Sequence, residues 1–165
     1  MRGHDKEKRD LEKYAIEWFL PQYNNIKGEN FSVLSRGESP DVILGSTNGY
    51  KIGLEITHLF YDNEEAKTLL GRTNKKMKSQ RFDNLINKLN MRIKDKSAKS
   101  FSYKCDFPIL LLIRSASPIF TVSDFKKAKN EIIIPNNAFS EIWLLAEADK
   151  SPTRSWELIH LYTSK

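Results

Sequence analysis

The clearest pattern in the chain is an alternation of apolar and polar residues from Tyr50 to Thr57. Its even positions carry Tyr, Ile, Leu and Ile, and its odd positions carry Lys, Gly, Glu and Thr. Because successive side chains of a strand point to opposite faces of a sheet, this alternation predicts a half-buried strand with one polar face. The apolar run 42–44 precedes it, and Gly45 with Asn48-Gly49 supplies a turn. The two segments therefore predict a β-hairpin.

Helical periodicity appears on both sides of this hairpin. Apolar residues spaced by three and four predict a first helix over 5–20, which Pro21 is expected to end. The same spacing predicts a long helix over 73–95 whose other face is basic. The unbroken apolar run 108–113 is typical of a central strand covered on both faces. One short helix and three more strands are expected at 123–129, 31–34, 142–146 and 156–162.

Composition narrows the class of protein. A chain of 165 residues with 39% hydrophobic residues predicts one folded domain over 1–165. The single Cys105 excludes a disulfide framework and a cysteine-rich zinc site. The first thirteen residues are highly charged and no apolar run approaches membrane-spanning length, so we expect a cytoplasmic protein with no membrane partner.

Positive charge is concentrated in one segment. The chain has a net charge of +6, but residues 73–104 carry ten basic and two acidic residues, which leaves the rest of the chain at −2. Such clustering is typical of a surface that binds a polyanion, although a basic helix face also occurs simply for solubility. The predicted nucleic-acid-binding residues are Lys75, Lys76, Lys78, Arg81 and Lys88.

Two carboxylates are expected to meet on the hairpin. A hairpin symmetric about Asn48 makes Asp41 the cross-strand neighbour of Glu55. Like charges placed opposite each other destabilise a sheet, so the pair needs a compensating cation unless both groups are exposed at an edge. Oxygen ligands without Cys or a His pair favour Mg²⁺ or Mn²⁺ over zinc. The hairpin therefore predicts a divalent metal site.

The residues Pro40-Asp41 and, across the hairpin, Glu55-Ile56-Thr57 resemble the signature of the PD-(D/E)XK nuclease superfamily. The resemblance implies a restriction-endonuclease-like core in the order helix, three strands, helix, strand. It also implies that Asp41, Glu55 and the carbonyl of Ile56 hold a metal ion. Thr57 stands where the family has a lysine that orients or activates the attacking water, and a hydroxyl cannot supply that positive charge. The expected fold is therefore α/β, a central mixed sheet flanked by helices, with extra C-terminal strands.

Other residues are candidates for completing the site. Thr57 could position water by hydrogen bonding, and Lys76 and Gln80 at the start of the long helix are candidates for replacing the missing lysine. Lys51 shares the face of Glu55 but lies roughly 13 Å along the strand, too far for a direct role. Because some members of the superfamily recruit an acid from the first helix, Glu12 and Glu17 are both candidates, and the predicted metal set takes Glu17 beside Asp41, Glu55 and Ile56.

The resulting hypothesis is a metal-dependent nuclease that hydrolyses phosphodiester bonds in DNA. The alternative, which Thr57 favours, is a catalytically inactive nuclease-fold protein that binds nucleic acid or a protein partner. His58 follows the motif and is interpreted as a capping or packing residue rather than a base. The sequence leaves open DNA against RNA, endonuclease against exonuclease action, and whether the chain forms a homodimer.

Overall fold

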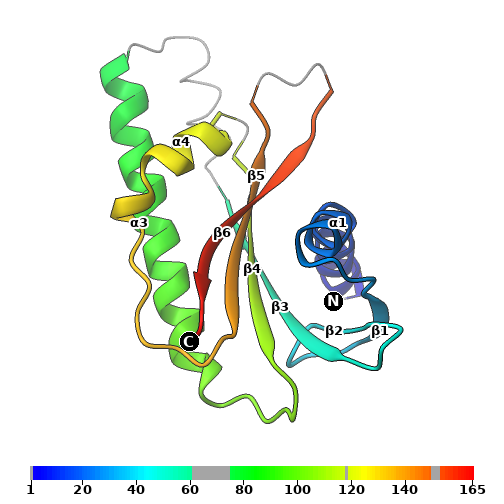
Figure 1. Cartoon of the computed structure of the whole chain (residues 1–165). Coiled ribbons are helices and arrows are strands. Elements are labelled where there is room, and N and C mark those ends of the chain that lie inside the picture. The colour runs from blue at the N-terminus through cyan, green and yellow to red at the C-terminus, as the bar shows by residue number, and fades with distance from the viewer. Residues whose placement is uncertain (1, 61–74, 118, 150–152) are drawn as a thin grey trace.

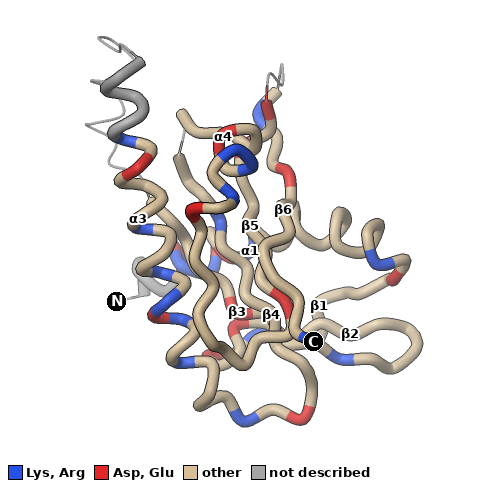
Figure 2. The backbone as a smooth tube through the Cα atoms, turned by 60° about the vertical axis from the view of Figure 1, so that its left-hand side comes forward, with Lys and Arg blue, Asp and Glu red and all other residues tan. Residues whose placement is uncertain are grey.

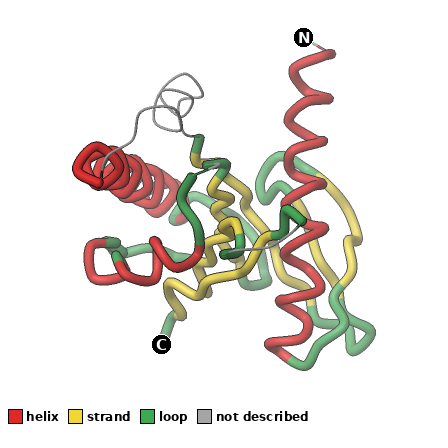
Figure 3. Tube along the Cα trace, turned by 90° about the horizontal axis from the view of Figure 1, so that it is seen from above, coloured by secondary structure: helices red, strands yellow, loops and turns green. Residues whose placement is uncertain are grey.

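The computed structural model describes residues 2–60, 75–117, 119–149 and 153–165, with the backbone alone at 2, 4, 5 and 75–80. Within these residues, six strands form one open sheet in the order β1-β2-β3-β4-β5-β6. Helix α1 lies on one face of the sheet, and α3 and α4 lie on the other (Figure 1). The view from above shows the same three layers, with strands between the two long helices (Figure 3). The predicted α/β class, a mixed sheet flanked by helices, is confirmed.

The elements follow the predicted order along the chain. They are α1 (Arg2–Lys27), β1 (Ser32–Arg36), β2 (Val42–Gly45), β3 (Lys51–Leu59), α3 (Lys75–Ser100), β4 (Ile109–Ser115), α4 (Val122–Lys127), the 3₁₀ turn η1 (Lys129–Glu131), β5 (Glu141–Glu147) and β6 (Trp156–Thr163). Among the described residues, none of these helices is both long and apolar enough to cross a membrane.

The first helix is longer than the sequence pattern predicts. Pro21 was expected to end it, but α1 continues to Lys27 with Pro21 exposed on its surface. Two aromatic side chains on either side of the proline, Phe19 and Tyr23, are buried and stacked with ring centroids 4.9 Å apart. We attribute the continuation to this packing, since burial of apolar surface often outweighs the local cost of a proline in a helix.

Strand directions divide the sheet into two parts. Strands β1, β2 and β3 are successively antiparallel, whereas β3, β4 and β5 are parallel and β6 is antiparallel to β5. Parallel neighbours need long crossover connections, and α3 lies in the connection from β3 to β4 while α4 lies in that from β4 to β5. The site-bearing strand β3 is therefore the junction between the antiparallel and parallel parts.

Two hydrophobic clusters hold the layers together. On one face, Leu89 and Ile93 of α3 pack with Leu111 of the central strand. On the other, Phe19 of α1 packs with Leu112. Every residue of β4 is buried, as the continuous apolar run predicted. Consecutive residues of β4 thus fill opposite cores, which explains why this strand shows no alternation.

Candidate functional site

The hairpin of β2 and β3 has the predicted register. Val42 pairs with Leu54, and the pairing is symmetric about Asn48. Asp41 directly precedes β2 and therefore faces Glu55. Both carboxylic residues are only 5% exposed. The alternative interpretation, two solvated carboxylates on an edge hairpin, is therefore wrong.

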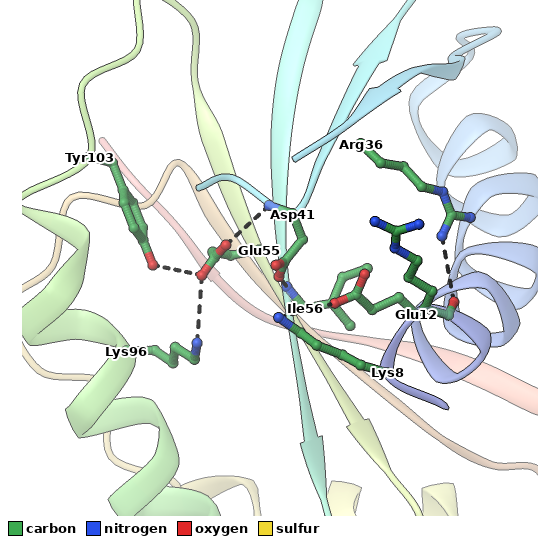
Figure 4. Close-up of polar contacts among 9 residues, drawn as sticks. Lys8, Glu12, Arg36, Asp41, Glu55, Ile56, Lys96 and Tyr103 are labelled. Carbon is green, nitrogen blue, oxygen red and sulfur yellow. Dashed lines mark hydrogen bonds and ion pairs between the residues drawn. The ribbon is translucent and has the colours of Figure 1, made fainter. Parts of the chain in front are cut away.

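The two acidic residues contact each other's strand reciprocally (Figure 4). The backbone N–H of Asp41 donates to Glu55 Oε1 at 3.2 Å, and the backbone N–H of Ile56 donates to Asp41 Oδ2 at 2.8 Å. The N–H and C=O of one strand residue point to the same side, and Gly53 N–H donates to the carbonyl of Pro108 on the β4 side. Three residues further on, the N–H and the carbonyl of Ile56 therefore both point to the opposite, unpaired side of β3, where the N–H meets Asp41. The two carboxylates and this carbonyl thus lie along the same edge of β3.

A notch in the sheet edge, where β2 has ended, leaves this part of β3 without a paired strand on that side. Pairing with β2 stops at the Val42–Leu54 pair, while β3 continues to Leu59 without a β2 partner in the described part of the chain. Gly53 shapes the approach, because a Cβ added there would lie 2.8 Å from Cγ of Pro40. The missing side chain lets Pro40 lie against the strand, and the residue after it is thereby directed at Glu55.

Two residues on the α3 side of the sheet contact the other carboxylate oxygen of Glu55. The hydroxyl of Tyr103 donates to Glu55 Oε2 at 2.8 Å, and Lys96 Nζ lies 3.5 Å from the same oxygen. Burial and the hydrogen bond to Glu55 raise the pKa of Tyr103, so this hydroxyl remains a donor. The side chain of Lys96 is 21% exposed and comes from the last part of α3. A cation thus reaches the motif from the helix.

Neither Lys96 nor Tyr103 was among the residues predicted for the site. The spacing of Leu89, Ile93, Lys96 and Ser100 is four, three and four, and the first two and the last of these are buried. That spacing places Lys96 on the sheet-facing stripe of α3 and could have indicated it. Tyr103 lies in the loop after the helix, and no sequence signal indicated it.

A third acid lies beside the pair. Glu12 on α1 is 6% exposed, with Lys8 Nζ 3.9 Å from its carboxylate. Burial raises the pKa of Asp41 to about 7; the hydrogen bond from Ile56 opposes this rise, and the charges of Glu55 and Glu12 add to it. Burial likewise raises the pKa of Glu12, against the opposing charge of Lys8. The three carboxyl groups therefore make a region that favours positive charge.

The acid that α1 supplies is Glu12 and not the predicted Glu17. Glu17 is exposed, because its spacing of five residues from Glu12 turns the helix by about 140°, away from the sheet. Thr57, in contrast, lies where it was predicted: it is buried two residues after Glu55, and the alternation of β3 directs both toward α3. The hydroxyl and the cation of Lys96 therefore approach the motif on the same face.

The beginning of α3 gives no information on several predicted residues. Among the nucleic-acid-binding candidates, Lys88 is exposed on α3 and Arg81 is half-buried. The other predictions fall on side chains outside the described residues: Lys75, Lys76, Lys78 and Gln80.

A second polar group lies next to the motif, on the α1 face. His58 is half-buried, and neither ring nitrogen has a hydrogen-bond partner among the described residues. Burial lowers the pKa of His58 to about 4, with further lowering from the charges of Arg114 and Arg92. The imidazole is therefore neutral at physiological pH, in keeping with a packing residue.

The donor set fits a hard divalent cation. Among the described residues, no three His, Cys, Asp or Glu side chains are grouped to hold a metal by themselves. Mg²⁺, however, commonly takes one or two carboxylates and completes its shell with water and substrate phosphate oxygens. Asp41, Glu55 and the Ile56 carbonyl supply such a set, and a cation would offset the effects of burial and of the neighbouring carboxylates, which raise the pKa of Asp41.

Comparison with known proteins identified no related protein. No protein-family model, curated protein or solved structure matches the chain. A function for this chain therefore has to be inferred from the geometry of its own residues.

Proposed function

We propose that the protein is a nuclease that uses Mg²⁺ or Mn²⁺ to hydrolyse phosphodiester bonds in DNA. One observation carries this proposal: Asp41 and Glu55, both almost fully buried, meet across the β2–β3 hairpin, and the backbone N–H of Ile56 donates to Asp41. Burying two neighbouring carboxylates is costly unless positive charge offsets both, and Lys96 is paired with Glu55 alone. In this proposal Asp41, Glu55 and the Ile56 carbonyl hold the metal.

The order of the described elements is one argument for this proposal. In the described part of the chain they run helix, three strands, helix, strand before the extra elements that end in β5 and β6, and this is the order that the resemblance to PD-(D/E)XK nucleases implies. The motif lies at the point where β2 ends and β3 continues, so a phosphodiester could approach from the sheet edge. The element order and the position of the motif support the proposal, and the catalytic activity itself is what we propose.

Lys96 takes the role of the missing motif lysine. Its ammonium lies 3.5 Å from Glu55 Oε2 and on the face that Glu55 shares with Thr57. A cation there can orient a water molecule and stabilise charge that develops on the phosphoryl oxygens. Tyr103 keeps the Glu55 carboxylate fixed from the same side. When bound, the metal would lower the pKa of a water ligand and polarise the phosphoryl group.

Protonation of Asp41 couples metal binding to pH. A metal ligand must be deprotonated, and the pKa of Asp41 is about 7 in the metal-free protein. Metal binding therefore competes with a proton below neutral pH. We expect cleavage to increase from about pH 6 to pH 8 as this carboxyl ionises.

The basic helix supports DNA as the substrate. Figure 2 shows Lys and Arg recurring along α3, and Lys88, Arg92 and Lys94 are exposed there. Each phosphate that such residues neutralise adds salt-sensitive affinity without reading sequence. Because α3 also carries Lys96, the same helix would bind the backbone and serve the reaction.

Thr57 favours one alternative. A chain without the motif lysine, in which Glu55 is already paired with Lys96, could retain nucleic-acid binding, or bind a protein partner, without catalysis. Loss of the chemistry would leave the basic helix in place. The two proposals differ in cleavage and agree on salt-sensitive binding of DNA.

Plasmid cleavage separates them. The wild-type protein should relax or linearise supercoiled plasmid with Mg²⁺ or Mn²⁺ and not with EDTA. Asp41→Ala and Glu55→Ala should abolish cleavage, whereas Glu17→Ala, which removes an exposed carboxylate of α1, should leave it unchanged. Circular dichroism shows whether each variant is folded. DNA binding without any cleavage by the folded wild type would refute the nuclease proposal and favour the inactive alternative.

A further inference from the structure

A cavity of about 230 Å³ opens between the N-terminal half of α1 and the turn that follows β1. Three cations, Lys8, Arg9 and Arg36, contribute to its lining. The other lining residues are Glu12, Gly37 and Glu38. All predicted nucleic-acid-binding residues lie on the long helix, so this basic cavity on the opposite face of the sheet has no assigned role.

The cations of the cavity are weakly neutralised. Arg36 Nη1 donates to the backbone carbonyl of Arg9 at 3.5 Å. In the described part of the chain, neither arginine forms an ion pair with a carboxylate, and Lys8 reaches Glu12 only at 3.9 Å. Two guanidinium groups thus retain donors for a ligand, and guanidinium donors match the oxygens of a phosphate group.

The cavity adjoins the proposed metal site in two ways. Its wall residue Gly37 donates its N–H to the backbone carbonyl of Asp41 at 3.0 Å. The side chain of its lining residue Glu12 extends from α1 toward Asp41 and Ile56 (Figure 4). Figure 4 shows Lys8, Glu12 and Arg36 on the side of Asp41 away from Lys96. Because Asp41 and Glu55 are each only 5% exposed, a substrate needs such a hollow beside them.

We propose that this cavity binds a backbone phosphate of the DNA strand next to the phosphate that is cleaved. The strand would pass along the notch of β3, with this flanking phosphate held by Arg9, Arg36 and Lys8 on the α1 side. The inference rests on the proposed function for its choice of a phosphate over other anions. In addition to the basic helix, the protein would then have a second phosphate-binding surface, and the two surfaces together would set the path of the substrate.

Salt-dependent DNA binding tests the cavity with a charge-matched control. The double variant Arg9→Gln/Arg36→Gln and the control Lys127→Gln/Lys129→Gln each remove two positive charges from exposed side chains. Binding of a labelled DNA duplex is measured by fluorescence anisotropy over a salt series, with Ca²⁺ in place of Mg²⁺. Each lost phosphate contact lowers the slope of log K against log salt by about 1. Because the cavity holds one phosphate, we expect the arginine variant to lose a slope of about 1 and the control to keep the wild-type slope.

The outcomes separate this inference from the nuclease proposal. A lower slope for Arg9→Gln/Arg36→Gln supports the phosphate-binding role of the cavity, whether or not wild type cleaves plasmid. If wild type binds DNA without cleaving it, only the nuclease proposal is overturned. Equal slopes for the arginine variant and the control, or no DNA binding by wild type, overturn the cavity assignment even if plasmid is cleaved. Arg9→Lys/Arg36→Lys keeps both charges and should restore the wild-type slope; failure to restore it would mean that the loss came from altered folding and would overturn the assignment.

Discussion

Asp41→Asn should make the protein more stable at alkaline pH although it removes a residue of the proposed active site. Asp41 is 5% exposed, and burial, together with the neighbouring charges of Glu55 and Glu12, disfavours its ionised form. Asparagine removes the charge and keeps an oxygen that can accept the hydrogen bond from Ile56 N–H. The variant therefore keeps the local contact and loses the repulsion.

The magnitude follows from the pKa. The pKa of Asp41 rises from 3.8 to about 7 on folding, so the folded protein binds this proton more tightly than the unfolded chain. Such a group contributes stability that is fully present below the unfolded pKa and is lost as pH rises through the folded pKa. Each pKa unit corresponds to about 1.4 kcal/mol, so wild type loses about 4 kcal/mol from this group between pH 3.8 and pH 7. The Asp41→Asn variant has no ionisable group at this position and does not lose this stability as pH rises.

Urea denaturation of both proteins from pH 5 to pH 8 measures this effect. The difference in free energy of unfolding, variant minus wild type, should grow by about 3 kcal/mol over that range. Titration of other groups that the substitution leaves unchanged cancels in the difference. Saturating Mg²⁺ should stabilise wild type at pH 8 and not the variant, because only wild type holds the ion. A difference that is independent of pH, or a variant that is less stable at pH 8, would refute the reasoning.

Three further substitutions test separate parts of the structure. Lys96→Met should reduce metal-dependent cleavage by about 100-fold or more in plasmid assays and should also lower the melting temperature, because it leaves the buried carboxylate of Glu55 without its cation. Lys96→Arg, which keeps the charge, should retain part of the activity and most of the stability. His58→Leu should make the protein less sensitive to acid. Because the pKa of His58 is lowered to about 4, wild type loses up to about 3 kcal/mol of its free energy of unfolding as pH falls from 6.5 to 4. Urea denaturation of both proteins at the two pH values would measure the difference. Leu89→Ala, at a fully buried core position, should cost about 2–5 kcal/mol by the same assay, whereas Met91→Ala on the exposed face of α3 should cost little.

Local patterns in the sequence were sufficient to predict the hairpin and its register. The alternation from Tyr50 to Thr57 and the turn around Asn48 place Asp41 opposite Glu55, and the structure has this pairing. Both signals depend on neighbours in the chain, because strand period and turn position determine which residues face each other. The metal-site hypothesis was accessible from sequence for this reason.

The helical contributions to the site were harder to predict. Lys96 lies 41 residues after Glu55 in the sequence, and its contact depends on how α3 is rotated and positioned over the sheet. Periodicity reports the buried stripe of a helix but not which strand residue that stripe meets. Glu12 belongs to such a stripe with the buried Ile16 and Phe19, spaced by four and three, which the choice of Glu17 overlooked.

A crystal grown or soaked with Mn²⁺ tests the central claim most directly. The anomalous difference map should show one ion between the carboxylates of Asp41 and Glu55 and in contact with the carbonyl of Ile56, at the roughly 2 Å spacing of a hard cation from its oxygen ligands. The same peak should be absent from crystals of Asp41→Asn treated identically. An empty notch in wild-type crystals, or carboxylates held too far apart to share one ion, would contradict the account.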